Sequence, residues 1–146
     1  MTPAAARGTL TGMNATFAVV GSIFVLLAAL IHLWIFALES VLWSRPSTWK
    51  QFGVRDERDA EVLRPMAYNQ GFYNVFLALG AGLGLVLLGT GFSREGGIAI
   101  AMFALASMVL AAVVLITSNP KMLRAAVIQG AAPLLGLIFL LLSLVA

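Results

Sequence analysis

The sequence contains no cysteine, a single histidine and few charged residues. The lack of cysteine excludes disulfides, thiolate metal sites, thioether-linked haem and cysteine nucleophiles. Only 10% of the 146 residues are charged, whereas 61% are hydrophobic. A mean hydropathy of +1.00 lies outside the range of soluble globular domains. The net charge of only +3 and the lack of a basic, aromatic-rich face argue against nucleic acid as a partner.

The sequence consists largely of long apolar runs. A membrane-spanning helix needs about 20 mostly apolar residues, and four segments meet that length, at about 15–42, 70–92, 97–117 and 125–146. They must be helices, because a backbone in lipid has to satisfy its own hydrogen bonds and four spans cannot close a barrel. The first run is too long for a signal peptide and lacks a small-residue cleavage site. We therefore expect an all-α membrane protein, with residues 1–146 forming one four-transmembrane-helix bundle.

The basic residues favour one side of the membrane. Two segments, 43–69 and the short link before the fourth run, hold seven of the nine Lys and Arg residues: Arg45, Lys50, Arg55, Arg58, Arg64, Lys121 and Arg124. The other side has only Arg7 and Arg94. The positive-inside rule thus predicts that loop 43–69 is cytoplasmic and that both termini are extracytoplasmic. This is the topology expected of a multi-pass protein of the cell (inner) membrane.

Two further features concern packing. Gly80 and Gly84 lie one turn apart on one face, which allows close approach of a neighbouring helix, either within the bundle or in a homodimer. The mixed-charge run 56–61, which leads through Pro65 into the second span, predicts a short interfacial helix or a solvated connector.

His32 and Glu39 are the strongest candidates for chemistry. Seven residues separate them, so in a regular α-helix they lie within about 20° of the same face, two turns apart. That face continues through small residues such as Ala28 and Gly21, which suit the bundle interior better than lipid. We expect the imidazole and the carboxylate to face inward and to act as catalytic proton donors or acceptors. One histidine and one carboxylate supply too few ligands for a metal site.

Polar residues at the same membrane depth complete the predicted site. Gln70, Tyr73 and Asn74 share one face of the second span. Gln129 lies in the first turns of the fourth span, and Pro133 frees the Gln129 carbonyl from its helical hydrogen bond. Because alternate spans are antiparallel, these groups and His32 and Glu39 converge in the cytoplasmic leaflet. The predicted ligand-binding residues are Trp43, Asn69, Gln70, Tyr73, Asn74 and Gln129.

These residues resemble a known family. His32 with Glu39 and Trp43, the block from Asn69 to Asn74, and the pair formed by Gln129 and Pro133 resemble the small four-helix membrane proteins of domain of unknown function 1304. The resemblance covers nearly the whole chain after the first dozen residues. It implies a compact four-helix membrane protein and names neither an activity nor a cofactor.

Three functions fit the residues. In the first, the polar pocket binds a small lipophilic molecule and His32 with Glu39 transfers a proton to or from it, which leaves open whether the protein is an enzyme. In the second, a homodimer is a proton-coupled exporter that uses Glu39 as its exchanging carboxylate. In the third, the protein is a structural or assembly subunit, Glu39 reaches the membrane surface as a snorkelling side chain, and the polar cluster only fixes helix register.

Overall fold

The computed structural model describes the backbone of residues 3–145 and the side chains of residues 14–145. It is all-α and 91% helical. The long helices are α1 (Pro3–Phe36), α3 (Glu57–Thr90), α4 (Arg94–Ser118) and α5 (Leu123–Val145). A π-helical turn, η1 (Ala37–Val41), continues α1, and the short elements are α2 (Pro46–Trp49), η2 (Lys50–Phe52) and η3 (Pro120–Met122).

Within the described residues, four helical segments are long and apolar enough to cross a membrane: Asn14–Val41, Glu57–Thr90, Arg94–Ser118 and Pro120–Val145. The predicted four-helix membrane architecture is therefore confirmed. This arrangement is the pattern of a multi-pass membrane protein.

The start of α3 differs from the sequence expectation. Asp56 caps the helix by accepting a hydrogen bond from the Asp59 amide (2.9 Å), and the helix then continues without a break through Pro65. The predicted interfacial helix is thus the beginning of α3 itself. At 34 residues and about 1.5 Å per residue, α3 is much longer than the roughly 30 Å hydrocarbon core. Its charged first turns extend beyond the apolar layer.

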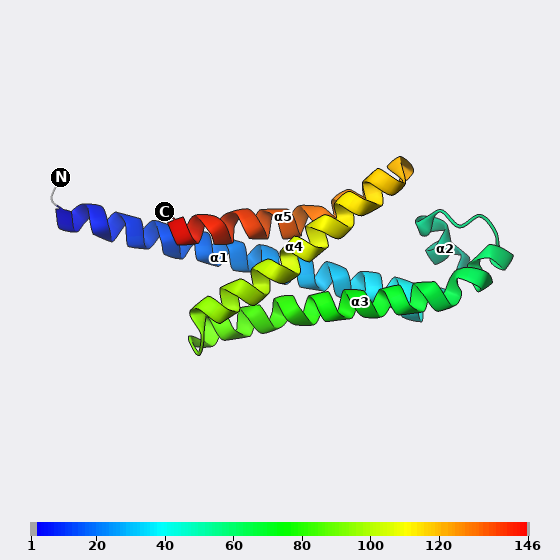
Figure 1. Ribbon diagram of the computed structural model, residues 1–146, viewed down its shortest axis with the longest axis horizontal. Coiled ribbons are helices and arrows are strands. Elements are labelled where there is room, and N and C mark those ends of the chain that lie inside the picture. Colours follow the sequence, from blue (N-terminus) through cyan, green and yellow to red (C-terminus); the bar gives the residue numbers. More distant parts are fainter. Residues whose placement is uncertain (1–2, 146) are drawn as a thin grey trace.

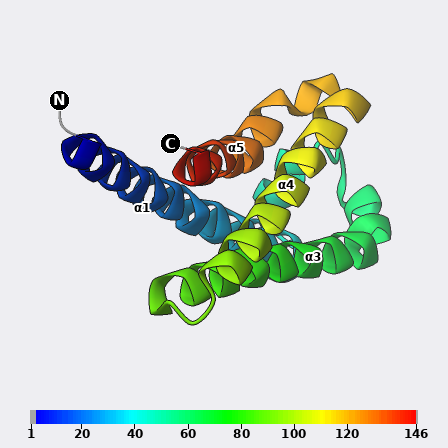
Figure 2. The same ribbon diagram turned by 60° about the vertical axis from the view of Figure 1, so that its left-hand side comes forward.

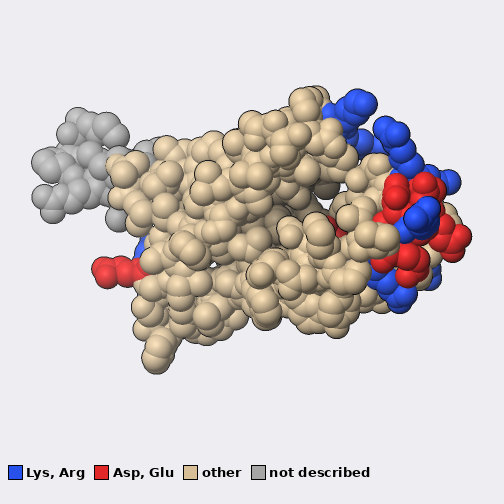
Figure 3. All heavy atoms as spheres, turned by 45° about the vertical axis from the view of Figure 1, so that its right-hand side comes forward, with Lys and Arg blue, Asp and Glu red and all other residues tan. Residues whose placement is uncertain are grey.

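The four long helices pack in the order α1, α3, α4 and α5, with α5 returning to α1. Both connections rich in Lys and Arg lie at one end of the bundle, and the α3–α4 turn lies at the other (Figures 1 and 2). We call the end with the two Lys- and Arg-rich connections the basic end. Figure 3 shows the charged side chains gathered there, beside a body that is almost uncharged.

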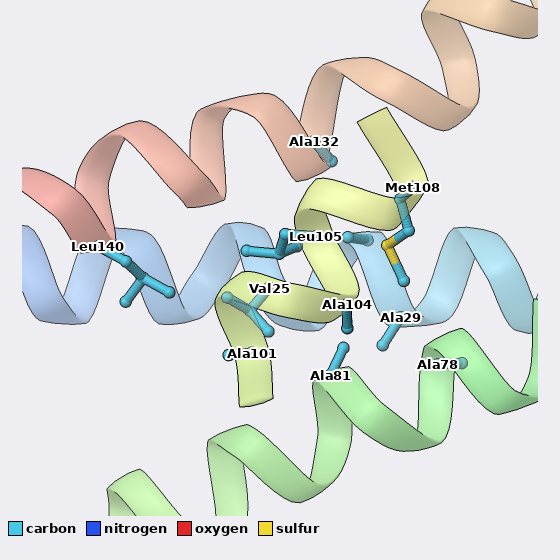
Figure 4. Close-up of a cluster of buried hydrophobic side chains, with 11 residues drawn as sticks. Val25, Ala29, Ala78, Ala81, Ala101, Ala104, Leu105, Met108, Ala132 and Leu140 are labelled. Atoms are coloured by element: carbon cyan, nitrogen blue, oxygen red, sulfur yellow. The ribbon is translucent and has the colours of Figure 1, made fainter. Parts of the chain in front are cut away.

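Small residues form the centre of the bundle (Figure 4). Ala81 of α3 faces Ala104 of α4 in one buried cluster, which also includes Ala78, Ala101, Leu105 and Met108. The two helices approach closely at Gly84, where an added Cβ atom would lie 2.7 Å from the Ala101 amide nitrogen. An added Cβ at Gly80 would lie 3.5 Å from the Ala104 Cβ. The glycine face predicted from the sequence therefore packs against α4 within the same chain.

A second, smaller core fixes the connection between α1 and α3. Trp43 and Trp49 are buried against Ala60 and Ala67 of α3. The indole Nε1 of Trp43 donates a hydrogen bond to the Ala60 carbonyl (2.9 Å). The connection therefore folds back over the first turns of α3.

Candidate functional site

The π-helical turn at the end of α1 sets the geometry of the site. Its five residues close with a hydrogen bond from the Leu42 amide to the Ala37 carbonyl (2.8 Å), one residue wider than an α-helical bond. Such turns occur frequently at functional sites. The expectation of a regular α-helix through Glu39 is wrong here, because residues 37–41 form this wider turn, although His32 and Glu39 are both buried.

Glu39 meets Asn74 in this position. The Asn74 amide nitrogen donates a hydrogen bond to the Glu39 oxygen Oε2 (2.9 Å) and a second one to the Gln70 carbonyl (3.1 Å). Both side chains are buried, with 8% of each residue exposed. The structure thus joins two residues of the predicted site, from two different spans, by a direct hydrogen bond.

A close contact beside Glu39 holds the π-helical turn on α3. The Ser40 hydroxyl donates a hydrogen bond to the Tyr68 carbonyl (2.9 Å). Opposite it lies Gly71, where an added Cβ atom would collide with the Ser40 hydroxyl and would lie 3.3 Å from the Glu39 Cβ. Gly71 is therefore the residue that allows α3 to approach this turn, a role that was not predicted from the sequence.

A pattern in α3 could have separated Asn74 from its polar neighbours. Ala67, Gly71, Ala78 and Ala81 are buried small residues that alternate by three and four positions along the helix, and Asn74 lies in the same line. A small-residue line marks the face that other helices approach. Of the polar residues Asn69, Gln70, Tyr73 and Asn74, only Asn74 lies on that face.

A pocket of about 410 Å³ opens beside the Glu39 carboxyl group. Its lining comes from the π-helical turn, the segment after it and the start of α3: Glu39, Ser40, Val41, Trp43, Ser44, Arg64, Pro65 and Tyr68. Figure 3 shows the surface hollowed between the apolar body and the charged end, with acidic atoms visible inside the hollow.

One carboxyl oxygen of Glu39 remains available. Among the described residues, Oε2 has Asn74 as its partner, whereas Oε1 has no hydrogen bond. No side-chain oxygen or nitrogen in this part of the chain is both buried and unpaired. Oε1 is therefore not fully buried, and Glu39 lines the pocket.

His32 lies deeper in α1 and has a separate partner. The residue is 2% exposed, and its Nδ1 donates a hydrogen bond to the Ala28 carbonyl (2.9 Å) in the preceding turn. Its other ring nitrogen, Nε2, forms no hydrogen bond with a described residue. His32 does not line the pocket that contains Glu39.

The other predicted ligand-binding residues are dispersed. Trp43 lines the pocket. Asn69, Gln70 and Tyr73 are exposed on the outer surface of α3. Gln129 is half-buried on α5, which packs on α1 and α4. In the part of the chain whose side chains are described, no three His, Asp or Glu residues lie close enough together to hold a metal ion.

Comparison with known proteins identifies a family. Neither the curated proteins nor the solved structures contain a match to the chain. A family profile matches residues 26–141, which include His32, Glu39, Asn74 and Gln129. The resemblance drawn from the sequence is confirmed, and the chain belongs to the family described as protein of unknown function DUF1304.

Proposed function

We propose that this protein binds a small amphiphilic molecule in the pocket beside Glu39. The apolar part of the molecule would contact Val41, Trp43 and Pro65, and its hydroxyl or amino group would donate a hydrogen bond to Glu39. One observation carries the proposal: a buried carboxyl group has one oxygen fixed by Asn74 at 2.9 Å while its second oxygen stays accessible, in the lining of a pocket.

The energetic cost of Glu39 supports a functional role. A charged carboxylate costs roughly 2.5 to 3.5 kcal/mol at the centre of a spanning helix and less near the interface, so such residues are rare and mark functional sites. A residue that only fixed helix register would need its bond to Asn74 but no open pocket beside it. The pocket volume of about 410 Å³ is in the range of about 300 to 1,000 Å³ typical of small-molecule sites.

We further propose that Glu39 exchanges a proton with the bound molecule and that His32 is a second proton carrier. Carboxyl and imidazole groups are the usual general acids and bases of proteins. Seven residues at about 1.5 Å each place His32 roughly 10 Å deeper along the helix. A proton would therefore pass between the two groups through water rather than across a direct hydrogen bond. This chemistry serves an enzyme and a proton-linked carrier equally.

The pocket would open toward the cytoplasmic leaflet of the inner membrane. The basic end carries seven of the nine Lys and Arg residues, and such loops usually stay in the cytoplasm. Reporter fusions in segment 48–60 should therefore behave as cytoplasmic, whereas fusions at Ser93 and at the C-terminus should behave as extracytoplasmic. The reverse pattern would place the pocket on the other side of the membrane.

The binding proposal is tested by extracting the purified protein with organic solvent and quantifying the retained small molecules by mass spectrometry. Glu39→Gln should reduce retention about tenfold or more, because a hydrogen bond to a charged group contributes roughly 1.5 to 3 kcal/mol. Glu95→Gln is the matched control, since this exposed carboxyl lies at the opposite end, in the first turn of α4. It should leave retention unchanged.

A second variant tests the pocket without altering Glu39. Ser44 is exposed and lines the pocket, so Ser44→Trp should fill the space and prevent retention while the fold survives. Wild-type retention in both Glu39→Gln and Ser44→Trp would overturn the proposal. Native mass spectrometry of the same samples also reports whether the chain forms the homodimer that an exporter would require.

A further inference from the structure

A second pocket lies at the end of the bundle opposite the basic end. Figures 1 and 2 show α1 and the end of α3 moving apart toward the α3–α4 turn. Between them is a shallow groove of about 520 Å³. It is lined by one face of α1, by the last turns of α3 and by the first residue of α4: Ala15, Ala18, Val19, Ser22, Ile23, Leu26, Leu85, Leu88 and Arg94.

The groove is apolar along its length. Small side chains at Ala15, Ala18 and Ser22 form part of its lining, alongside larger apolar ones. The Ser22 hydroxyl donates a hydrogen bond to the Ala18 carbonyl (2.8 Å) within the same helix, so it does not need a polar partner from a ligand. Such a lining suits a hydrocarbon chain.

The length of the groove matches one leaflet of a bilayer. The α1 residues that line it run from position 15 to position 26, which spans roughly 16 Å at about 1.5 Å per residue. One half of the hydrocarbon core is about 15 Å thick. An acyl chain that follows the groove would therefore reach from the membrane boundary to the bilayer centre.

Arg94 supplies a charge at one end of this apolar path. It is the first residue of α4 and of the apolar span Arg94–Ser118, which places it at the membrane boundary. It is exposed, and among the described residues it forms no ion pair. The neighbouring Glu95 does not line the groove. A guanidinium group binds a phosphate through two parallel hydrogen bonds.

We propose that this groove binds one anionic phospholipid of the leaflet opposite the basic end. The phosphate of the lipid pairs with Arg94, and one acyl chain lies between α1 and the end of α3. The order of the groove, with a cation at the boundary and apolar side chains toward the centre, matches the order of a phospholipid along the membrane normal.

The test uses photolabelling of the full-length protein in phosphatidylcholine vesicles. The vesicles contain a small fraction of phosphatidylglycerol with a diazirine in one acyl chain, and the labelled peptides are mapped by mass spectrometry. Labels should concentrate on residues 15–26 and 85–88. Arg94→Gln should reduce labelling there about fivefold, the effect of about 1 kcal/mol for one basic residue near a membrane surface.

Controls separate this site from general lipid contact. Arg124→Gln removes the same charge at the basic end and should leave labelling of the groove unchanged. A diazirine phosphatidylcholine has the same phosphate, but its choline cation offsets that charge. It should therefore label the groove more weakly than phosphatidylglycerol and should lose less labelling than phosphatidylglycerol in Arg94→Gln. Ala18→Phe should reduce labelling by both lipids, because the added ring occupies the groove.

Three results would overturn the proposal. The first is equal labelling of the groove by the two lipids. The second is an Arg94→Gln variant that labels like Arg124→Gln. The third is protection of residues 15–26 by a second copy of the chain, seen as a dimer in native mass spectrometry with no lipid label in the groove.

Discussion

The middle of the bundle and its basic end are built on different principles. In the middle, the buried cluster is composed of apolar side chains, and next to it, toward the α3–α4 turn, Gly84 and Gly97 bring α3 and α4 into backbone contact. At the basic end, Ser40, Asn74 and Trp43 hold the chain together through side-chain hydrogen bonds around an open pocket. The contrast indicates that stability resides mainly in the middle and that the polar end is free to carry function.

The largest effect should come from breaking the backbone contact between α3 and α4. A Cβ atom at Gly84 would lie 2.7 Å from the Ala101 amide nitrogen and 2.8 Å from the Gly97 carbonyl oxygen. Backbone atoms cannot rotate away, so Gly84→Leu should cost roughly 3 kcal/mol or more. Thermal unfolding in detergent measures the change, and retention of the small molecule should be lost only as the fold is lost.

Two other glycines of α3 calibrate this result. Gly80→Leu should cost less, since its nearest neighbour is the Ala104 Cβ at 3.5 Å. Gly89→Leu should be neutral or slightly stabilising, because no atom lies within 4 Å of the added Cβ and leucine favours a helix over glycine. Identical melting temperatures for the three variants would contradict the view that the contact between α3 and α4 at Gly84 stabilises the bundle.

A smaller loss of stability is expected at His32. Its buried ring bonds to the Ala28 carbonyl. Because removing a buried ring leaves a cavity, His32→Ala should lower the free energy of unfolding by about 2 kcal/mol. Because His32 does not line the pocket, the variant should still retain the bound molecule. If retention disappeared while the melting temperature stayed unchanged, His32 would have to contact the molecule directly.

A still smaller loss of stability should follow from Gly71→Ala. The added methyl group would collide with the Ser40 hydroxyl, which can rotate away only by giving up its bond to the Tyr68 carbonyl. The expected cost is about 1 kcal/mol, together with a displaced Glu39 and weaker retention. Gly82→Ala is the control, since nothing lies within 4 Å of its added Cβ.

A double-mutant cycle with Ser40→Ala identifies the cause of that cost. Removing the hydroxyl relieves the collision, so Gly71→Ala should be less destabilising in the Ser40→Ala background than in the wild type. Additive effects would show that Gly71 and Ser40 do not interact in the way that the contact indicates.

The sequence was sufficient for the spans because their length and composition determine them. In lipid, apolar runs of this length have to form helices. The start of α3 also has an ordinary signal, because Asp is a common N-cap residue and Asp56 caps this helix. Glu39 was identifiable for a related reason, since a carboxyl group among apolar residues is conspicuous.

The local geometry of the site could not be predicted in the same way. The π-helical turn leaves no mark in composition, because Ala37 to Val41 would also suit an α-helix. The contact between Ser40 and Gly71 depends on how α1 and α3 are placed along each other, which tertiary packing sets. Gln70 and Tyr73 share a broad face with Asn74, yet only Asn74 is on the buried line.

We propose that Glu39, fixed by Asn74, binds a small molecule without being needed for the fold. The most direct measurement combines Glu39→Gln and Asn74→Ala, singly and together, with retained molecules quantified by mass spectrometry and stability followed by thermal unfolding. Each single variant should lose about tenfold of the retention, the double variant should lose little more, and all three should melt close to the wild type. Wild-type retention in the single variants, or losses that only follow a collapse in melting temperature, would contradict the account.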